Sequence, residues 1–336
     1  MTQRSFIAKR ENDWKEMEQF VSGNARRGFF ARARRHSKDQ ASWFPQAFRQ
    51  LMGDLNTARS HGFDPALIER LNRLTLEGNQ ILYGPKSFSL KAFSDFFFRA
   101  FPNAVRSQWK SFGVCCLIFF GLAVFAALVC VRFPGFVYEL MSPWEAAMME
   151  DMYNPENEYY LKPREISTDA DMFGYYIYNN ISIAFMVFAG GILAGAGSLI
   201  MLAVNAIFIG AAAGHIINSG HADTFFSFVI GHSAFELTAI VISAQAGLML
   251  GYRLFVTRGI SRGEALREAG KTALPLISGS AFMLVIAAVV EAFWSSRHEI
   301  SQDIRFAAGG TAIFLVILYF IFAGRTRSGA SAEKRP

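Results

Sequence analysis

Apolar residues in this chain gather into runs that are long enough to cross a lipid bilayer, and the runs begin only after the first third of the sequence. A helix of about 20 apolar residues spans the hydrocarbon core of a membrane. The stretch 173–217 holds no charged residue and is too long for one crossing, so we expect a helical hairpin that turns within 194–198. The pattern predicts an all-α membrane protein with six transmembrane helices, at 112–131, 177–193, 199–217, 233–252, 273–293 and 306–322.

The first 85 residues show a different pattern, in which apolar residues recur every three or four positions with charges between them. This spacing is typical of amphipathic helices, and it predicts an N-terminal helical domain with helices at 12–21, 43–60 and 65–83. Residues 86–110 combine aromatic rings with Lys and Arg, so we expect an interfacial amphipathic helix there, kinked at Pro102. A core helix of the N-terminal domain is the alternative for this segment.

Charge is distributed unevenly along the chain, whose formal net charge is +6. Residues 1–110 hold 19 Lys and Arg against 10 Asp and Glu, whereas the loop 132–172 holds 3 against 9. Basic segments of membrane proteins stay on the cytoplasmic side. We therefore expect a cytoplasmic domain over 1–85, a transmembrane domain over 111–323 with an exoplasmic acidic loop, and a basic cytoplasmic tail over 324–336. The N-terminus has no apolar h-region, so no cleavable signal peptide is expected.

Within the acidic loop, Ser142-Pro-Trp-Glu145 has the spacing of a capping box with proline at the first helical position. We expect a short exoplasmic helix that ends near Tyr153. The loop is also rich in Tyr and Trp, which suits either a protein interface or rings that rest at the lipid headgroups.

A dense basic segment lies between the first two predicted helices, with Phe29 and Phe30 interleaved among the charges. Near a membrane surface, anionic lipid attracts each basic residue with about 1 kcal/mol. We predict contact with the phospholipid membrane and no nucleic-acid binding, and a protein-docking surface is the alternative. The predicted lipid-facing residues are Arg26, Arg27, Arg32, Arg34, Arg35 and Lys38.

Three ionisable residues interrupt the predicted spans: His232 and Glu236 near the start of the fourth, and Glu291 near the end of the fifth. A charge at the bilayer centre costs about 3 kcal/mol on insertion scales. We therefore expect these side chains to face one another or water, and not the acyl chains. Ser233 and Glu236 also have capping-box spacing, which favours a structural role at a helix start. A proton- or ion-coupled role and metal ligation are the alternatives.

Amides and glycines of the spans predict how the helices pack. Asn179, Asn180 and Asn205 belong to the predicted polar intramembrane cluster, where amides usually bond between helices for about 1 kcal/mol each; solute contact is the alternative. Pairs of glycines four residues apart allow helices to approach closely, which indicates a tightly packed bundle or a homodimer. These pairs are Gly191 and Gly195, Gly210 and Gly214, and Gly247 and Gly251.

The sequence offers little support for catalysis. It has no His-Glu-x-x-His pattern, and its three cysteines, Cys115, Cys116 and Cys130, all lie in the first predicted span without a metal-ligand spacing. His215 and His221 are expected in a loop. We therefore expect no catalytic residue, no metal centre and no cofactor, and we do not predict an enzyme.

Several of these features together resemble the stage II sporulation protein M family of bacterial membrane proteins. They are the asparagines that open the second span, Asn205, the segment from Gly231 through Glu236 to Ile240, the pair Gly247 and Gly251, and Glu291-Ala-Phe. Asp13-Trp14 and the segments 48–59 and 71–83 resemble the longer, non-sporulation branch, so the likeness covers most of 10–295. The family more often has Pro-His-Gly before its glutamate, where this chain has Gly231-His232-Ser233.

The resemblance implies a function without catalysis. Its sporulation member scaffolds peptidoglycan hydrolases, and the wider branch tends to occur beside AAA ATPases of the MoxR type, so both are expected as partners by resemblance only. The leading hypothesis is a multi-pass scaffold or assembly protein of the bacterial plasma membrane, with both termini cytoplasmic. A transporter or channel that uses His232, Glu236 and Glu291 is the first alternative. A metal-dependent intramembrane enzyme is the second.

Overall fold

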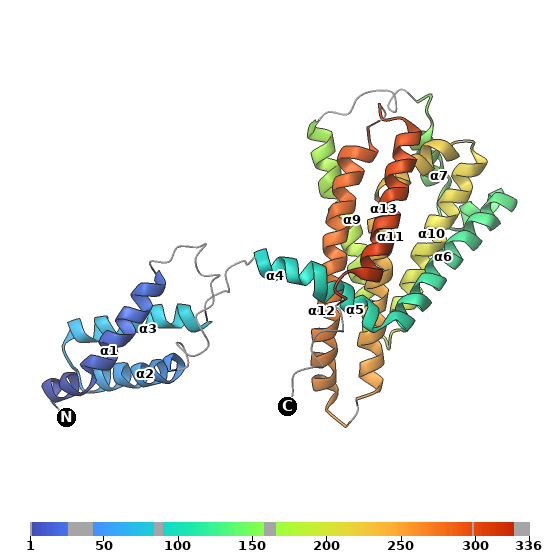
Figure 1. Cartoon of the computed structure of the whole chain (residues 1–336). Coiled ribbons are helices and arrows are strands. Elements are labelled where there is room, and N and C mark those ends of the chain that lie inside the picture. The colour runs from blue at the N-terminus through green and yellow to red at the C-terminus, as the bar shows by residue number, and fades with distance from the viewer. Residues whose placement is uncertain are drawn as a thin grey trace, which may run out of the picture. The chain divides into compact units, whose positions relative to one another are not determined.

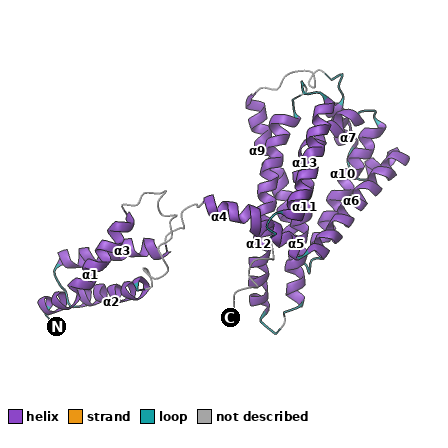
Figure 2. Cartoon of the chain, viewed as in Figure 1, coloured by secondary structure: helices purple, strands orange, loops and turns teal. Residues whose placement is uncertain are grey.

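The structure, a computed structural model, describes residues 2–25, 43–83, 90–157, 166–257, 259–297 and 299–325. The described residues are helical apart from turns and short connections, and none of them forms a strand (Figures 1 and 2), which confirms the all-α prediction. The chain divides into two compact units, residues 1–93 and 94–336. The predicted lipid-facing residues within 26–38, and residues 326–336 of the tail, lie outside the described residues.

Three helices of the first unit enclose one apolar core. They are α1 (Gln3–Ala25), α2 (Phe44–Ser60) and α3 (Pro65–Tyr83). Trp14, Phe44, Leu51 and Leu71, which come from all three helices, are buried together in this core. The helix α3 has the predicted bounds, whereas α1 is longer than predicted because Phe6 extends its buried face toward the N-terminus.

Arg70 links the polar sides of α1 and α3. Its Nη1 lies 2.9 Å from Oε2 of Glu11, its Nε lies 2.8 Å from Oε1 of Glu18, and its guanidinium stacks over the ring of Trp14. Guanidinium groups suit such arrangements because their donors form a planar fork. The hydrogen bond from Arg70 lowers the pKa of Glu11.

The second unit is a bundle of long helices. They are α6 (Trp109–Arg132), α9 (Ile166–Ala189), α10 (Ala196–Asn218), α11 (Ala222–Phe255), α12 (Arg262–Val290) with the π-helical turn η4 (Glu291–Ser295), and α13 (Gln302–Phe322). Among the described residues, five helices are long and apolar enough to cross a membrane: α6, α10, α11, α12 with η4, and α13. The helix α9 packs in the same bundle, but Asn179, Asn180 and three tyrosines reduce its apolarity. The count of six spans therefore stays a prediction.

The segment before α6 consists of α4 (Leu90–Asp95), the π-helical turn η1 (Phe96–Ala100) and α5 (Phe101–Ser107). Of these, η1 and α5 pack against the bundle. The π turn directly precedes Pro102, whose ring and missing N–H disturb the preceding turn of a helix. Phe101 and Val105 are buried against α12 and α13, and Arg106 donates to the carbonyl of Phe320 at 2.7 Å. The placement of this segment in the headgroup layer stays a prediction.

The connection after α6 forms the short helix α7 (Pro143–Tyr153), which follows the 3-10 helix η2 (Pro134–Glu139). The predicted capping box is confirmed: the Ser142 hydroxyl accepts from the N–H of Glu145, and the Glu145 carboxylate accepts from the N–H of Ser142. These hydrogen bonds lower the pKa of Glu145. At its other end, α7 contacts α11, because the Thr224 hydroxyl donates to the carbonyl of Tyr153 at 2.5 Å.

His215 lies in a helix and not in a loop as predicted. It lies in the last turns of α10, is buried, and its Nε2 lies 2.9 Å from Oε1 of Glu150 on α7. The helix ends at Asn218, one residue past the predicted end of the third span, so His215 is helical. His215 therefore joins α10 to α7, whereas His221 directly precedes α11.

Helices α9 and α10 form the predicted hairpin, which turns through Ala194 and Gly195 with φ of 64° and 82°. At each of the six glycines named above, an added Cβ would fall 3.1 Å or less from an atom of another segment. Gly210 and Gly214 face Ala123 and Ala127 of α6, while the other four lie where the hairpin meets α11. Since these close contacts are made within the chain, the glycine spacings give no argument for a homodimer.

We call the part of the bundle formed by residues 187–202 and 239–251 the close-packed region. Serine hydroxyls here bond to backbone carbonyls of a neighbouring helix: the Ser198 hydroxyl donates to the carbonyl of Val187 at 2.6 Å, and the Ser280 hydroxyl of α12 donates to that of Ala239 at 2.7 Å. Gln245 is fully buried, and its Nε2 donates to the carbonyl of Val105 at 3.0 Å. Small side chains allow backbones to approach where lipid supplies no hydrophobic drive between helices.

Candidate functional site

The helix α11 carries two of the three ionisable residues, His232 and Glu236. It begins earlier than the predicted fourth span. It runs without a break from Ala222 to Phe255, so residues 224–230, which precede the predicted fourth span at 233–252, belong to the same helix. Ser233 lies inside the helix and its hydroxyl donates to the carbonyl of Ile230 at 3.4 Å, so the capping box with Glu236 is wrong. His232 lies ten residues along α11, about 15 Å from its start, and Glu236 follows one turn later.

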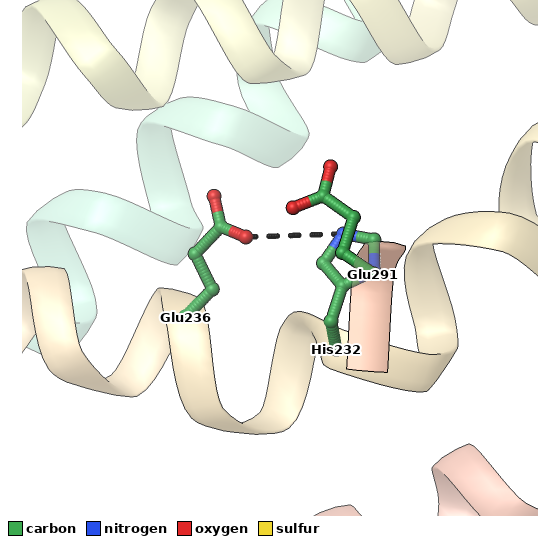
Figure 3. A group of neighbouring side chains, drawn as sticks. All are labelled: His232, Glu236 and Glu291. Atoms are coloured by element: carbon green, nitrogen blue, oxygen red, sulfur yellow. Dashed lines mark ion pairs between the residues drawn. The ribbon is translucent and has the colours of Figure 1, made fainter. Parts of the chain in front are cut away.

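Glu291 reaches the same place from α12. It is the first residue of the π-helical turn η4, where the helix accommodates a wider turn. Such turns occur frequently at functional sites. The ligand-type atoms of His232, Glu236 and Glu291 all lie within 4.8 Å of one another, and the side chains converge between the helices (Figure 3). We call these three residues the ionisable triad.

Each nitrogen of the His232 ring has a defined neighbour. Nε2 faces Oε2 of Glu236 at 3.8 Å, and Nδ1 lies 3.4 Å from the hydroxyl of Ser295, which belongs to η4. The ring also packs edge-on against Phe228. Gly231 makes the approach to η4 possible, because a Cβ there would fall 2.6 Å from the Trp294 ring and 2.7 Å from the Ser295 hydroxyl.

A cavity of about 380 Å³ opens beside the triad between α7, α10 and α11. Its polar wall includes His232, Ser233 and Glu236, and its apolar wall includes Met148 and Met152 of α7. No Lys or Arg is among the residues that line it. Since α7 belongs to the acidic loop 132–172, the cavity extends from this loop to His232 and Glu236.

The predicted asparagines are not joined to the triad by the hydrogen bonds of the described residues. The Asn205 amide donates to the carbonyl of Met201 on its own helix at 2.8 Å, and the Asn179 amide donates to the Asn180 side chain at 3.3 Å. Asn180 is buried on α9, and its Nδ2 has no hydrogen-bond partner in the described structure. The predicted polar cluster thus divides into the triad and separate amides that contact their own helices.

Sequence reasoning missed two contacts that hold η4 in place. Ser295 contacts His232, and Arg297 forms a salt bridge with Asp169, whose side chain is fully buried at the start of α9. A serine next to a predicted span end and an acid in an acidic loop carry no distinctive pattern, so neither contact could be predicted from the sequence. A separate segment, Gly259-Ile-Ser-Arg-Gly263, matches the G-x-S-x-G pattern of a nucleophile elbow. Here, however, Ser261 is the N-cap of α12, because its hydroxyl accepts from the N–H of Glu264.

The bundle and its buried triad define a helical membrane protein with an ionisable site among its membrane-spanning helices. The family model described as "Stage II sporulation protein M" matches residues 116–296, more than half of the chain, and the chain belongs to this family, as its motifs predicted. A second model, described as a domain of unknown function, matches residues 4–84.

A curated relative also matches this chain. It is an uncharacterized protein of Methanocaldococcus jannaschii, 29% identical over 117 residues, which are 34% of this chain and 66% of the relative. The match therefore spans slightly less than two thirds of that protein. No solved structure matches the chain.

Proposed function

We propose that this protein is a membrane-embedded scaffold that holds partner proteins on both sides of the membrane and has no catalytic activity of its own. The observation that supports the proposal best is the close-packed region, which follows the triad residues along α11. There Ala239, Ile242, Ala244 and Ala246 are fully buried, and glycine backbones of the hairpin and α11 touch. A packed interior of this kind suits a rigid support, whereas a transporter needs a route past its binding site.

The proposed topology follows the charge distribution. All six long helices, α9 included, cross the bacterial plasma membrane, and both termini and the basic segment 26–38 lie at its cytoplasmic face. The acidic loop with α7 is then exoplasmic. The first unit, with its own core and polar surface, presents a docking domain to the cytoplasm.

Two surfaces are available to partners. On α7, Trp144, Met148 and Met152 are largely exposed beside the cavity. Exposed aromatic and Met side chains favour protein contact. The family resemblance suggests peptidoglycan hydrolases for the exoplasmic surface and a MoxR-type AAA ATPase for the cytoplasmic first unit.

Affinity purification after cross-linking in native membranes tests the scaffold. We expect the full chain to recover a reproducible protein set, and the double variant Trp144→Ser, Met152→Ser to lose its exoplasmic members while it keeps the cytoplasmic ones. Gly121→Ser, on an open face of α6, is the control for an altered surface. Recovery of the same proteins by an unrelated six-span protein would overturn the proposal.

An ion or solute transporter is the second candidate, and the cavity that meets the triad favours it. Proteoliposomes that contain the purified chain test it directly. Cation flux that the Glu236→Gln variant loses while it elutes as a folded protein would favour transport. Absence of flux above that of empty liposomes would leave the scaffold as the better account.

A further inference from the structure

We propose that the ionisable triad is a binding site for one divalent transition-metal ion, with zinc as the best fit. The three residues offer one imidazole nitrogen and two carboxylates. This ligand set suits zinc and related ions, whereas calcium and magnesium prefer oxygen ligands alone. The inference concerns this buried site and does not depend on a scaffold or transport role.

Distances within the triad fit a shared ion better than a direct hydrogen bond. At 3.8 Å, His232 Nε2 and Glu236 Oε2 are too far apart for one. Zinc binds nitrogen and carboxylate oxygen at about 2.1 Å, so two tetrahedral ligands of one ion lie about 3.4 Å apart. All three ligand atoms are within 4.8 Å of one another, so small side-chain rotations bring them to this spacing.

The imidazole is already oriented as a metal-bound histidine would be. Its Nδ1 lies 3.4 Å from the Ser295 hydroxyl, which leaves Nε2 directed at Glu236, and Glu291 lies close to both residues. A hydrogen bond to the other ring nitrogen is the usual support of a histidine that binds a metal, because it selects the tautomer. Ser295 comes from the same π-helical turn as Glu291, so η4 supplies both a ligand and the support of another.

Charge and access also suit a cation. If both carboxylates ionise at this separation they repel each other, and a divalent ion bound to both offsets that repulsion. His232 and Glu236 line the cavity of about 380 Å³, which is large compared with the about 30 Å³ that one water occupies. The cavity provides the route of entry and room for a fourth ligand, water or a small anion.

The test uses the full-length chain in lipid nanodiscs, with its affinity tag removed and after dialysis against chelator. We expect titration with Zn²⁺ to saturate at one ion per chain, and Co²⁺ in its place to give the visible absorption of a four-coordinate site. Glu236→Gln and Glu291→Gln each bind at least tenfold more weakly. Ser295→Ala retains all three ligands and loses about tenfold in affinity.

A matched control comes from another histidine–glutamate pair of the bundle, the buried His215 with the partly exposed Glu150. His215→Gln and Glu150→Gln keep one ion per chain with unchanged affinity. Thermal unfolding in chelator shows that each variant folds like the wild type before metal is added. The proposal fails if the wild type binds no zinc, cobalt or manganese, if Glu236→Gln and Glu291→Gln bind as the wild type does, or if the control variants lose the ion equally.

Discussion

The same helix, α11, passes through two regions of opposite character. In its second half, six of the thirteen residues 239–251 are Ala, Gly or Ser, and Gly247 and Gly251 touch the backbone of the α9–α10 hairpin. In its first half, Phe225, His232 and Glu236 stand beside a cavity. Helices in lipid associate through close packing, so the close-packed region stabilises the bundle. The triad region is thereby free to hold groups that oppose folding.

Enlarging a glycine of the close-packed region gives the largest expected effect. In Gly247→Ile, the Cβ alone would fall 2.8 Å from the Phe188 carbonyl, and backbone atoms there cannot rotate away. We expect a loss of more than about 3 kcal/mol, seen as loss of the monodisperse elution peak. Gly121→Ala, with nothing within 4 Å, is the control and leaves the protein as stable as the wild type. A Gly247→Ile protein that is as stable as the wild type would contradict the conclusion that the close-packed region stabilises the bundle.

Removal of a buried amide gives an intermediate effect. Gln245 donates from α11 to the carbonyls of Val105 and Gln108, where the chain passes from α5 to α6. Gln245→Leu leaves both carbonyls without this donor, and we expect a loss of about 1–2 kcal/mol, the upper range for hydrogen bonds in bundles. Reversible unfolding in mixed detergent measures it. Asn205→Leu should cost less, because the Asn205 amide donates to the carbonyl of Met201 on its own helix.

Substitution in the triad should leave stability nearly unchanged. Glu236→Leu removes a carboxylate that is largely buried beside His232, and replacing a buried charge by an apolar group is often neutral or stabilising. In chelator, we expect a change within about 1 kcal/mol of the wild type in the same unfolding assay. A loss as large as that of Gln245→Leu would show that the triad holds the fold together.

The most local effect is expected at α7, which covers the cavity. Ser142→Ala removes the hydroxyl that caps the helix. We expect about fivefold faster amide hydrogen exchange in α7, as the loss of a typical N-cap predicts, and no change in α10 or α11. Pro143→Ala at the next position is the control, because it leaves both capping hydrogen bonds in place. Equal exchange rates in wild type and Ser142→Ala would show that tertiary contacts alone hold α7.

The sequence predicted features that depend on local spacing. The hairpin turn near Gly195, the capping box at Ser142 and the bounds of α3 follow from patterns within a few residues. The same kind of pattern was wrong at Ser233, because capping-box spacing also occurs inside a helix. There the preceding residues continue α11, and Gly231 is small because Trp294 lies against it, not because the helix breaks.

Proximity between distant segments could be anticipated only in part. The cost of burying charge correctly suggested that His232, Glu236 and Glu291 would approach one another. The supporting contacts of Ser295 and Arg297, and the cavity under α7, depend on how α12 ends and on how three helices diverge. No spacing within one segment encodes either of these, so the structure was needed to find them.

The π-helical turn η4 gives the helix one residue more than ordinary winding needs. Deletion of one residue between Glu291 and Ser295 would therefore restore ordinary winding and leave the segment after it in nearly its present orientation. Deletion of one residue from α12 before Glu291 would instead rotate Glu291 and everything after it by about 100° around the axis. Glu291 would turn away from His232 and Arg297 away from Asp169, although every named side chain is still present. Among relatives, a missing residue should therefore fall inside η4 more often than within α12.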